Sequence, residues 1–249
     1  MRSLTSHFIG SMKKAIVIGA TSGIGKELAK LLADNHYNVG ITGRRTELLL
    51  ELKQQRPDNF ITKTFDIQET NTIPKHLGEL VNELGGLDLL VLSSGTGDLN
   101  DRLDFELEKR TIDTNVSGFT SIVDWTFNFF EKQQAGHLVA ISSIAGIRGS
   151  RIAPSYNATK AFQINYLEGL RQKASKLKMP IIVTDIRPGF VNTAIAKGED
   201  QFWVASVEKA AMQIFDAIIR KKKVVYVSRR WRLIAILLKL IPRAFYERM

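Results

Sequence analysis

A tyrosine and a lysine are four residues apart in the segment Tyr156-Asn157-Ala158-Thr159-Lys160. If this segment is helical, the two side chains share a face, and the lysine ammonium lies near the phenol. A neighbouring positive charge favours the phenolate and lowers the pKa of Tyr156, which suits a general acid/base for an alcohol or carbonyl oxygen. The pair alone also fits a half-buried tyrosine that only packs, so its interpretation depends on the residues around it.

A second kind of chemistry is indicated near the N-terminus by the segment Gly19-Ala20-Thr21-Ser22-Gly23-Ile24-Gly25. It joins an apolar run to residues 24–33, in which apolar residues recur at helical spacing. Glycines in such a turn let the backbone approach a ligand closely, and the N–H groups at the start of a helix favour an anion. The segment therefore predicts a loop that binds the pyrophosphate of a dinucleotide. A glycine turn without a ligand is the alternative.

The end of the next predicted strand indicates which dinucleotide is bound. The sequence there reads Thr42-Gly43-Arg44-Arg45, with no acidic residue for the ribose 2′-hydroxyl of NAD. The two guanidinium groups suit the 2′-phosphate of NADP and the face of the adenine ring. We therefore expect NADP(H) as the preferred cofactor and NAD(H) as a second option. The alternative is that Arg44 and Arg45 are simply solvated.

Strand-like and helix-like segments alternate along most of the chain, and this pattern predicts the framework that positions these residues. Strands separated by crossover helices form right-handed βαβ units and a parallel sheet. We predict a single α/β domain over residues 13–228, a Rossmann-type doubly wound parallel sheet with helices on both faces. The expected strands are residues 14–19, 37–42, 60–65, 87–92, 136–142, 180–186 and 224–227. The expected helices are residues 24–33, 47–55, 73–84, 119–132, 155–178 and 206–219, the last with Ser206 as its N-cap.

These motifs, in this order, resemble the short-chain dehydrogenase/reductase family, with its G-x-x-x-G-x-G loop and Y-x-x-x-K pair, over about residues 13–227. The resemblance implies that Ser143 holds the substrate oxygen, that Asn115 supports a water leading to Lys160, and that residues 188–193 hold the nicotinamide carboxamide. It also implies that Asp66 contacts the adenine amino group. The implied catalytic residues are Ser143, Tyr156, Lys160 and Asn115. The implied cofactor-binding residues are Gly19, Thr21, Ser22, Gly23, Ile24, Gly25, Arg44, Arg45, Asp66, Ile67, Ser94, Gly95, Tyr156, Lys160, Pro188, Gly189, Val191 and Thr193.

The chain departs from the family pattern in two places. The family commonly has Asn-Asn-Ala-Gly after the fourth strand, where this chain reads Leu92-Ser93-Ser94-Gly95. Gly95 preserves the close approach to the cofactor, and we expect the serines to retain the turn with weaker stabilisation. Ile18 replaces the threonine that often precedes the first glycine. Neither change removes a catalytic group.

The resemblance implies an oxidoreductase that interconverts a carbonyl and an alcohol by hydride transfer between nicotinamide C4 and the carbonyl carbon. Tyr156 would exchange the proton of the oxygen while Ser143 orients that oxygen. Lys160 would tune the tyrosine and hold the nicotinamide ribose, and Asn115 would complete a proton relay. We expect reduction as the cellular direction and a homodimer or homotetramer as the assembly. The alternative is an NADP(H)-binding scaffold or redox sensor without turnover.

The 249-residue chain carries a formal net charge of +10, which invites a nucleic-acid-binding interpretation. Residues 220–249 contribute ten basic groups and one acidic group, so residues 1–219 have a net charge of only +1. A nearly neutral body with a basic tail is not the pattern of a nucleic-acid binder. The absence of cysteine excludes a disulfide framework, cysteine metal sites and a catalytic thiol, and we expect no metal site. It is compatible with the cytoplasmic location that we expect.

Residues 229–249 predict a basic amphipathic helix that Pro242 kinks or ends. Its apolar core is too short to span a bilayer but suits the interface of an anionic membrane, with Trp231 at headgroup depth. Two alternatives stay open: the tail roofs the substrate pocket, or it packs against a partner subunit.

Aromatic residues at positions 190, 202 and 203 favour an apolar, lipid-like substrate. Residues 1–12 form an N-terminal extension whose irregular sequence lacks the apolar core of a signal peptide.

Overall fold

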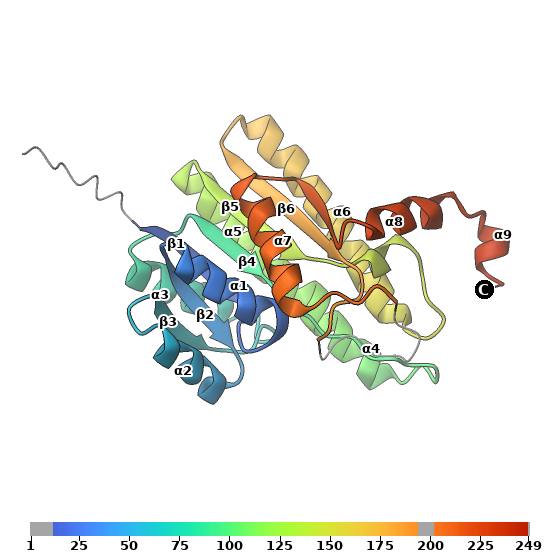
Figure 1. Cartoon of the computed structure of the whole chain (residues 1–249), viewed down its shortest axis with the longest axis horizontal. Coiled ribbons are helices and arrows are strands. Elements are labelled where there is room, and N and C mark those ends of the chain that lie inside the picture. Colours follow the sequence, from blue (N-terminus) through green and yellow to red (C-terminus); the bar gives the residue numbers. More distant parts are fainter. Residues whose placement is uncertain (1–11, 194–201, 249) are drawn as a thin grey trace, which may run out of the picture.

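The structure of the chain, a computed structural model, describes residues 12–193 and 202–248, so residues 1–11 of the extension lie outside the described part. In these residues a seven-stranded parallel sheet has the strand order β3-β2-β1-β4-β5-β6-β7 (Figure 1). The chain moves outward from β1 to one edge and then outward from β4 to the other. The strands are β1 (Lys13–Ile18), β2 (Tyr37–Gly43), β3 (Phe60–Thr64), β4 (Leu89–Leu92), β5 (Gly136–Ile141), β6 (Ile181–Pro188) and β7 (Val224–Val227).

Helices cover both faces of this sheet. One hydrophobic core lies under α1, α2 and α7, and a second lies under α3, α5 and α6. The helices that flank the sheet are α1 (Gly23–Asp34), α2 (Thr46–Gln55), α3 (Ile73–Leu84), α4 (Phe105–Ile112), α5 (Phe119–Gln133), α6 (Pro154–Leu177) and α7 (Val207–Ile219). The predicted single-domain, doubly wound α/β fold is therefore confirmed.

The central strands are apolar at nearly every position because both of their faces are covered. Along β1 the side chains alternate between the two cores: Ala15 and Val17 enter the first, while Ile16 and Ile18 enter the second. All four of these residues are fully buried. This packing holds the carboxyl end of β1 rigidly in the middle of the sheet, where the glycine loop begins.

All seven predicted strands and all six predicted helices of the domain are present, with ends that differ by two residues or fewer. Ser206 caps α7 as predicted, since its hydroxyl accepts from the Lys209 N–H at 3.2 Å. The sequence did not predict α4, which is capped by Asp104, or the π-helical turn η1 (Asp113–Gly118) that joins α4 to α5. Helix α4 has only 8 residues and buries only Thr111, and η1 is a single short turn, so neither is long enough for a clear pattern of buried apolar residues.

The tail forms two helices instead of one. Helix α8 (Trp231–Leu240) follows β7 closely, Pro242 interrupts the chain, and α9 (Arg243–Tyr246) is a single turn. The break at Pro242 agrees with the prediction from sequence. In Figure 1 both helices lie to one side of the sheet, beyond α6. None of the helices in the described residues is both long enough and apolar enough to cross a membrane.

Candidate active site

A cavity of about 860 Å³ opens at the carboxyl ends of β1, β4, β5 and β6. Its walls include residues that follow each of these strands, among them Gly19, Ser94, Ser143 and Gly189. Open α/β sheets bind their ligands at this edge, where the strand order reverses. The reversal in this sheet lies between β1 and β4, which is directly below the glycine loop.

The glycine loop is shaped so that backbone reaches the cavity. Gly19 has a φ of +88°, and a Cβ on it would lie 2.6 Å from Ser94 Oγ and 2.8 Å from Ser94 N. Gly25 has a different role, because a Cβ on it would lie 2.1 Å from the Gly19 carbonyl oxygen. Gly25 therefore lets α1 pack against the loop and does not itself line the cavity. Ser22 is the N-cap of α1 but does not cap it through its side chain, so the first-turn N–H groups suit an anion.

Two arginines stand above this loop at the end of β2. Arg45 Nη2 donates to Thr21 Oγ1 at 2.7 Å and to Ser22 Oγ at 3.0 Å. Arg44 Nη1 donates to Asp66 Oδ2 at 3.2 Å, while its side chain remains two-thirds exposed. Both line the cavity. Their positive charge therefore borders the cavity beside the glycine loop.

Ser143, Tyr156 and Lys160 meet on the other side of the cavity. Ser143 caps the short 3₁₀ helix η2 (Ile144–Ile147), and its Oγ accepts from the Ala145 N–H at 3.1 Å and hydrogen-bonds Tyr156. Tyr156 lies in the first turn of α6 and Lys160 one turn later. The Lys160 Nζ is 5.8 Å from the centre of the Tyr156 ring. A hydroxyl, a phenol and an ammonium therefore converge on one point of the cavity wall.

Burial decides the proton affinities in this cluster. It raises the pKa of Tyr156, and the hydrogen bond with Ser143 opposes that rise only in part. The sequence predicted a lowered pKa from the nearby lysine, and here the cost of removing a phenolate from water outweighs that attraction. Burial also lowers the pKa of Lys160 to about 8, although the negative charge of Asp185 acts to raise it. At neutral pH Tyr156 is thus a neutral acid beside a charged lysine.

A buried ion pair lies below the cluster. Asp185 of β6 is fully buried and accepts from Arg187 Nε at 2.7 Å and from Ser142 Oγ at 2.5 Å. Because Ser142 directly precedes Ser143, this contact fixes the backbone that presents the cavity hydroxyl. In the sequence, this pairing is indicated only by two charged residues in an apolar strand.

Asn115 lies behind the cavity wall and is fully buried. Its side chain accepts from the Thr96 N–H at 3.0 Å and donates to the Thr96 carbonyl at 2.7 Å and to Thr159 Oγ1 at 3.1 Å. It therefore ties the turn after β4 to α6. Its backbone carbonyl accepts from Gln163, a residue that the sequence analysis did not select, and Gln163 also contacts Lys160.

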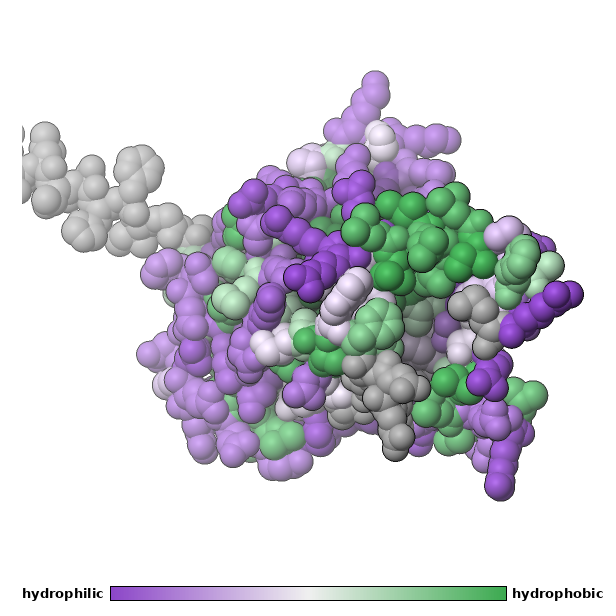
Figure 2. All heavy atoms as spheres, turned by 45° about the vertical axis from the view of Figure 1, so that its right-hand side comes forward, coloured by the Kyte–Doolittle hydropathy of each residue, from purple (hydrophilic) through white to green (hydrophobic). Residues whose placement is uncertain are grey.

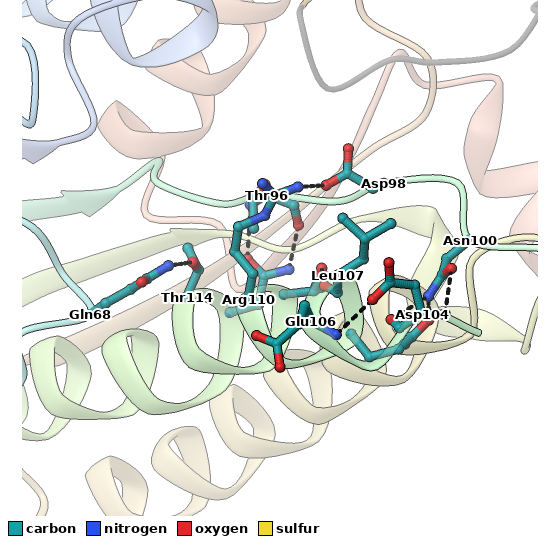
Figure 3. Close-up of polar contacts among 12 residues, drawn as sticks. Gln68, Thr96, Asp98, Asn100, Asp104, Glu106, Leu107, Arg110 and Thr114 are labelled. Atoms are coloured by element: carbon teal, nitrogen blue, oxygen red, sulfur yellow. Dashed lines mark hydrogen bonds and ion pairs between the residues drawn. The ribbon is translucent and has the colours of Figure 1, made fainter. Parts of the chain in front are cut away.

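The segment after β4 is held against α4 and η1 (Figure 3), and α4 in turn contacts the start of the helix that carries the phenol. Glu108 of α4 accepts from Asn100 Nδ2 and from the Ser155 N–H at the start of α6. Arg110 pairs with Asp98, and Gln68 donates to Thr114 Oγ1 at 2.7 Å. These contacts place residue 97 directly on the phenol ring.

Gly97 is the residue of this segment that contacts the phenol. A Cβ on it would lie 2.3 Å from Tyr156 Cδ2 and 2.8 Å from Cε2. The backbone thus supports one face of the ring, and only glycine fits there without displacing it.

Phe190 and Trp231 line another wall of the cavity, and two more rings pack against them from outside. We call the four side chains the aromatic roof: Phe190, Phe202, Trp203 and Trp231. The Trp231 ring is nearly buried, with its centre 5.4 Å from that of Phe190 and 5.1 Å from that of Phe202. It also covers Gly189, where a Cβ would lie 2.0 Å from the indole.

The roof is joined to the tail helices. Arg148 donates to the Leu238 and Ile241 carbonyls at the end of α8, and Tyr246 donates to the Gly149 carbonyl at 2.6 Å. Leu238 and Tyr246 line the cavity together with Trp231. Of the alternatives for the tail, its role as a roof of the pocket is therefore visible in the fold.

The cavity brings together most of the residues predicted from sequence. Ser143, Tyr156 and Lys160 line it, and so do all the predicted cofactor-binding residues except Gly25. Sequence reasoning missed Gly97, Arg148 and Gln163, whose roles depend on contacts between distant segments. It placed Trp231 at membrane headgroup depth, which is wrong, because the indole is buried over the cavity. The binding and catalytic roles of all these residues remain predictions of the geometry.

Comparisons with known proteins agree with this arrangement. The model of the short chain dehydrogenase family matches residues 13–202. An uncharacterized oxidoreductase of Myxococcus xanthus is 34% identical over 190 residues, covering 74% of each chain. One from Mycobacterium tuberculosis is 32% identical over 190 residues, 73% of this chain and 74% of the relative.

Among solved structures, a short-chain dehydrogenase from Streptomyces avermitilis has a TM-score of 0.80 at 22% identity, covering 92% of both chains. ElxO with NADP bound has a TM-score of 0.76 at 21% identity, over 86% of this chain and 96% of its own. The closed form of serine dehydrogenase complexed with NADP+ has a TM-score of 0.78 at 24% identity, over 86% and 93%. These similarities show the shared fold.

Proposed function

The chain belongs to the short-chain dehydrogenase family, and we propose that it is an NADP(H)-dependent oxidoreductase that interconverts a carbonyl and an alcohol on an apolar substrate. The family membership establishes an oxidoreductase. The observation that carries the rest is the convergence of Ser143, Tyr156 and Lys160 on a cavity whose far end is the glycine loop. The aromatic roof closes the same cavity and supplies an apolar surface for the substrate.

The proton chemistry follows from the pKa directions. Tyr156 is protonated at neutral pH because burial raises its pKa, so it can give its proton to a carbonyl oxygen. The Ser143 hydroxyl lies beside the phenol and can hold that oxygen at hydrogen-bond distance. The charged Lys160 stabilises the phenolate left behind. Bound NADPH supplies the hydride for the carbonyl carbon, and proton and hydride together form the alcohol.

Arg44 and Arg45 support a preference for the phosphorylated dinucleotide. They are the charged groups at the end of β2, and relatives of the same fold have been solved with NADP. Replacing both by alanine should weaken NADPH binding about 10- to 100-fold and weaken NADH binding by clearly less, because only NADPH carries the 2′-phosphate. Arg56→Ala is the matched control, since Arg56 pairs with Asp34 at the far end of α2. Equal losses for both nucleotides would contradict the preference.

The outer face of α8 supports contact with an anionic membrane. Leu233, Ile236, Leu237 and Leu240 recur at helical spacing and are each about half exposed or more. Figure 2 shows a continuous apolar surface on this side of the molecule, bordered by hydrophilic residues. Arg232 and Lys239 flank the apolar residues on the same helix. An apolar stripe beside cations fits the interface of a bilayer that contains anionic lipid.

Because the inner face of α8 carries part of the aromatic roof, the membrane test must spare it. Changing Leu233, Leu237 and Leu240 to glutamine leaves Trp231 and Ala235 in place. The wild-type protein should sediment with vesicles of anionic lipid, and the triple variant should remain in the supernatant. Vesicles of neutral lipid serve as the control for charge. Equal sedimentation of both proteins would rule out docking through α8.

We also propose a homodimer or homotetramer. Phe105 and Ile112 of α4 and Phe162 of α6 are exposed apolar side chains on two neighbouring helices. Light scattering on the wild type and on a Phe105→Asp variant tests this surface, with a monomer expected for the variant alone. A monomeric wild type would end the proposal.

The second candidate function is a nucleotide-binding scaffold or redox sensor. Comparing NADPH binding with NADPH oxidation distinguishes it from an enzyme. NADPH binding is measured by fluorescence, and NADPH oxidation is measured against a panel of hydrophobic ketones and aldehydes. We expect binding and turnover with at least one member. Binding without turnover on the whole panel would favour the scaffold.

A further inference from the structure

Gln163 is a buried amide that connects the lysine of the cluster to the backbone of a different helix. It lies on the same face of α6 as Tyr156 and Lys160, seven and three residues beyond them, and is 1% exposed. Its Oε1 accepts from Lys160 Nζ at 3.0 Å, and its Nε2 donates to the Asn115 carbonyl at 2.9 Å. The side chain thus spans the gap between α6 and η1.

The chemistry of the two partners fixes the orientation of this amide. A carbonyl only accepts hydrogen bonds and an ammonium only donates them, so the amide nitrogen must face Asn115 and the oxygen must face Lys160. The π-helical turn makes the Asn115 carbonyl accessible. The N–H of Phe119, which would donate to it in a regular α-helix, donates to the Thr114 and Val116 carbonyls.

The ammonium of Lys160 is 4% exposed and has three hydrogens to place. Among the described residues, the Ile141 carbonyl accepts one at 3.1 Å and Gln163 accepts another. With both acceptors present, the third hydrogen has a fixed direction. Since Lys160 lines the cavity beside Gly95, that hydrogen is available to a ligand there.

We propose that Gln163 is a positioning residue that anchors the Lys160 ammonium to the Asn115 carbonyl and keeps it charged and directed into the cavity. This proposal rests on the proposed function only in one respect, that Lys160 contacts the bound nucleotide and stabilises the Tyr156 phenolate. A charged group removed from water needs fixed acceptors, and Gln163 provides one of the two that the described part of the chain offers to Lys160. Its amide group does not release protons, so the contact holds the lysine and does not carry protons away from it.

Within residues 12–193 and 202–248, two other ionisable groups face Lys160, and neither is changed in the test. Tyr156 lies one turn earlier on α6, and Asp185 approaches from β6, where it pairs with Arg187. A change at position 163 alters neither of them directly. A shift in the titration of Lys160 therefore reports the loss of the amide contact.

The experiment measures the protonation of Lys160 without relying on turnover. Protein with ¹³Cε-labelled lysine is titrated by NMR, and the Lys160 signal is assigned by its absence in Lys160→Arg. Gln163→Met removes both hydrogen bonds at similar volume, and Gln163→Glu keeps an oxygen acceptor in the same place. Gln172→Met, at an exposed position of α6, is the matched control. NADPH binding is measured over the same pH range.

We expect Gln163→Met to lower the titration midpoint of Lys160 by about one pH unit or more, because it loses a hydrogen bond to a charged group. Gln163→Glu should leave the midpoint at or above that of the wild type, and Gln172→Met should not move it. NADPH binding by Gln163→Met should weaken at a lower pH than in the wild type.

An unchanged midpoint in Gln163→Met, or an equal decrease in Gln163→Glu, would overturn the proposal. If Gln163→Met does not fold, a midpoint in Gln163→Glu below that of the wild type overturns it. The titrations do not require turnover. Failure of the proposed enzyme activity can therefore be distinguished from failure of the proposed role of Gln163.

Discussion

The two walls of the cavity are built by different forces. The wall that carries Ser143, Tyr156 and Lys160 is held by hydrogen bonds to residues of η1, β5 and β6. The aromatic roof is held by ring contacts and, through α8, by the hydrogen bonds of Arg148. Polar groups must be held at defined distances to transfer a proton, whereas apolar contacts tolerate changes in the shape of the side chains. Under the proposed function, the polar wall carries out the reaction and the aromatic roof selects the substrate.

The largest effect is expected from Tyr156→Phe, which removes the acid from the polar wall. Turnover should fall by about 10²- to 10⁴-fold, the usual contribution of a general acid, while NADPH binding stays within a few-fold of the wild type. Rates and fluorescence titrations on the same preparation separate the two quantities. Turnover close to that of the wild type would show that another group supplies the proton.

A smaller but still large effect is expected from Gly97→Ala, which pushes on the phenol without changing its chemistry. The new methyl carbon would lie 2.3 Å from the ring, so Tyr156 or the backbone must move. A displacement of this size should lower kcat by about 10²-fold. Gly169→Ala, on α6 with nothing within 4 Å, is the control and should retain full activity. Full activity in Gly97→Ala would show that the ring is not held by this contact.

Because the charge of Lys160 is lost at high pH, we expect kcat/KM for NADPH to depend on pH, with an effect of intermediate size. The pKa of Lys160 is lowered to about 8, so the ammonium is present below that pH and is lost above it. The kcat/KM for NADPH, which reports the free enzyme, should be level at lower pH and decrease about tenfold per pH unit well above 8. Lys160→Arg keeps its charge and should move this decrease to higher pH. A profile that stays flat to pH 10 would contradict the role of the ammonium.

The smallest effect is expected on the roof. Trp231→Ala should raise KM for an apolar carbonyl about tenfold and change kcat by less than about threefold, because only apolar contact is lost. Trp125→Ala, which removes a ring stacked on Phe129 of α5 away from the cavity, is the matched control for lost stability. If Trp231→Ala lowers kcat as strongly as Gly97→Ala, the separation between the two walls is wrong.

The same difference explains how much was predictable from the sequence. The strands, the glycine loop and the Tyr156–Lys160 spacing follow from local periodicity and short motifs, because each lies within one or two adjacent elements. Gly97, Gln163 and Trp231 contact the site from segments that are distant in sequence. A glutamine in a helix or a tryptophan in a basic tail has no local pattern that indicates its partner.

The pKa of Tyr156 illustrates the same limit. The four-residue spacing to Lys160 correctly places a positive charge nearby, but the degree of burial depends on the whole fold. Here burial has the larger effect, and the direction is opposite to that expected from the pair alone. Spacing indicates which groups meet, whereas packing sets their protonation.

Transfer of a label tests the central claim most directly. NADPH that carries deuterium at the transferable C4 position is incubated with the protein and hydrophobic carbonyl compounds, and the alcohols are analysed by mass spectrometry. We predict deuterium on the carbinol carbon of at least one product with the wild type, and labelled product formed at least about 10²-fold more slowly with Tyr156→Phe. If NADPH binds and no product carries deuterium, the protein is not the carbonyl reductase proposed here.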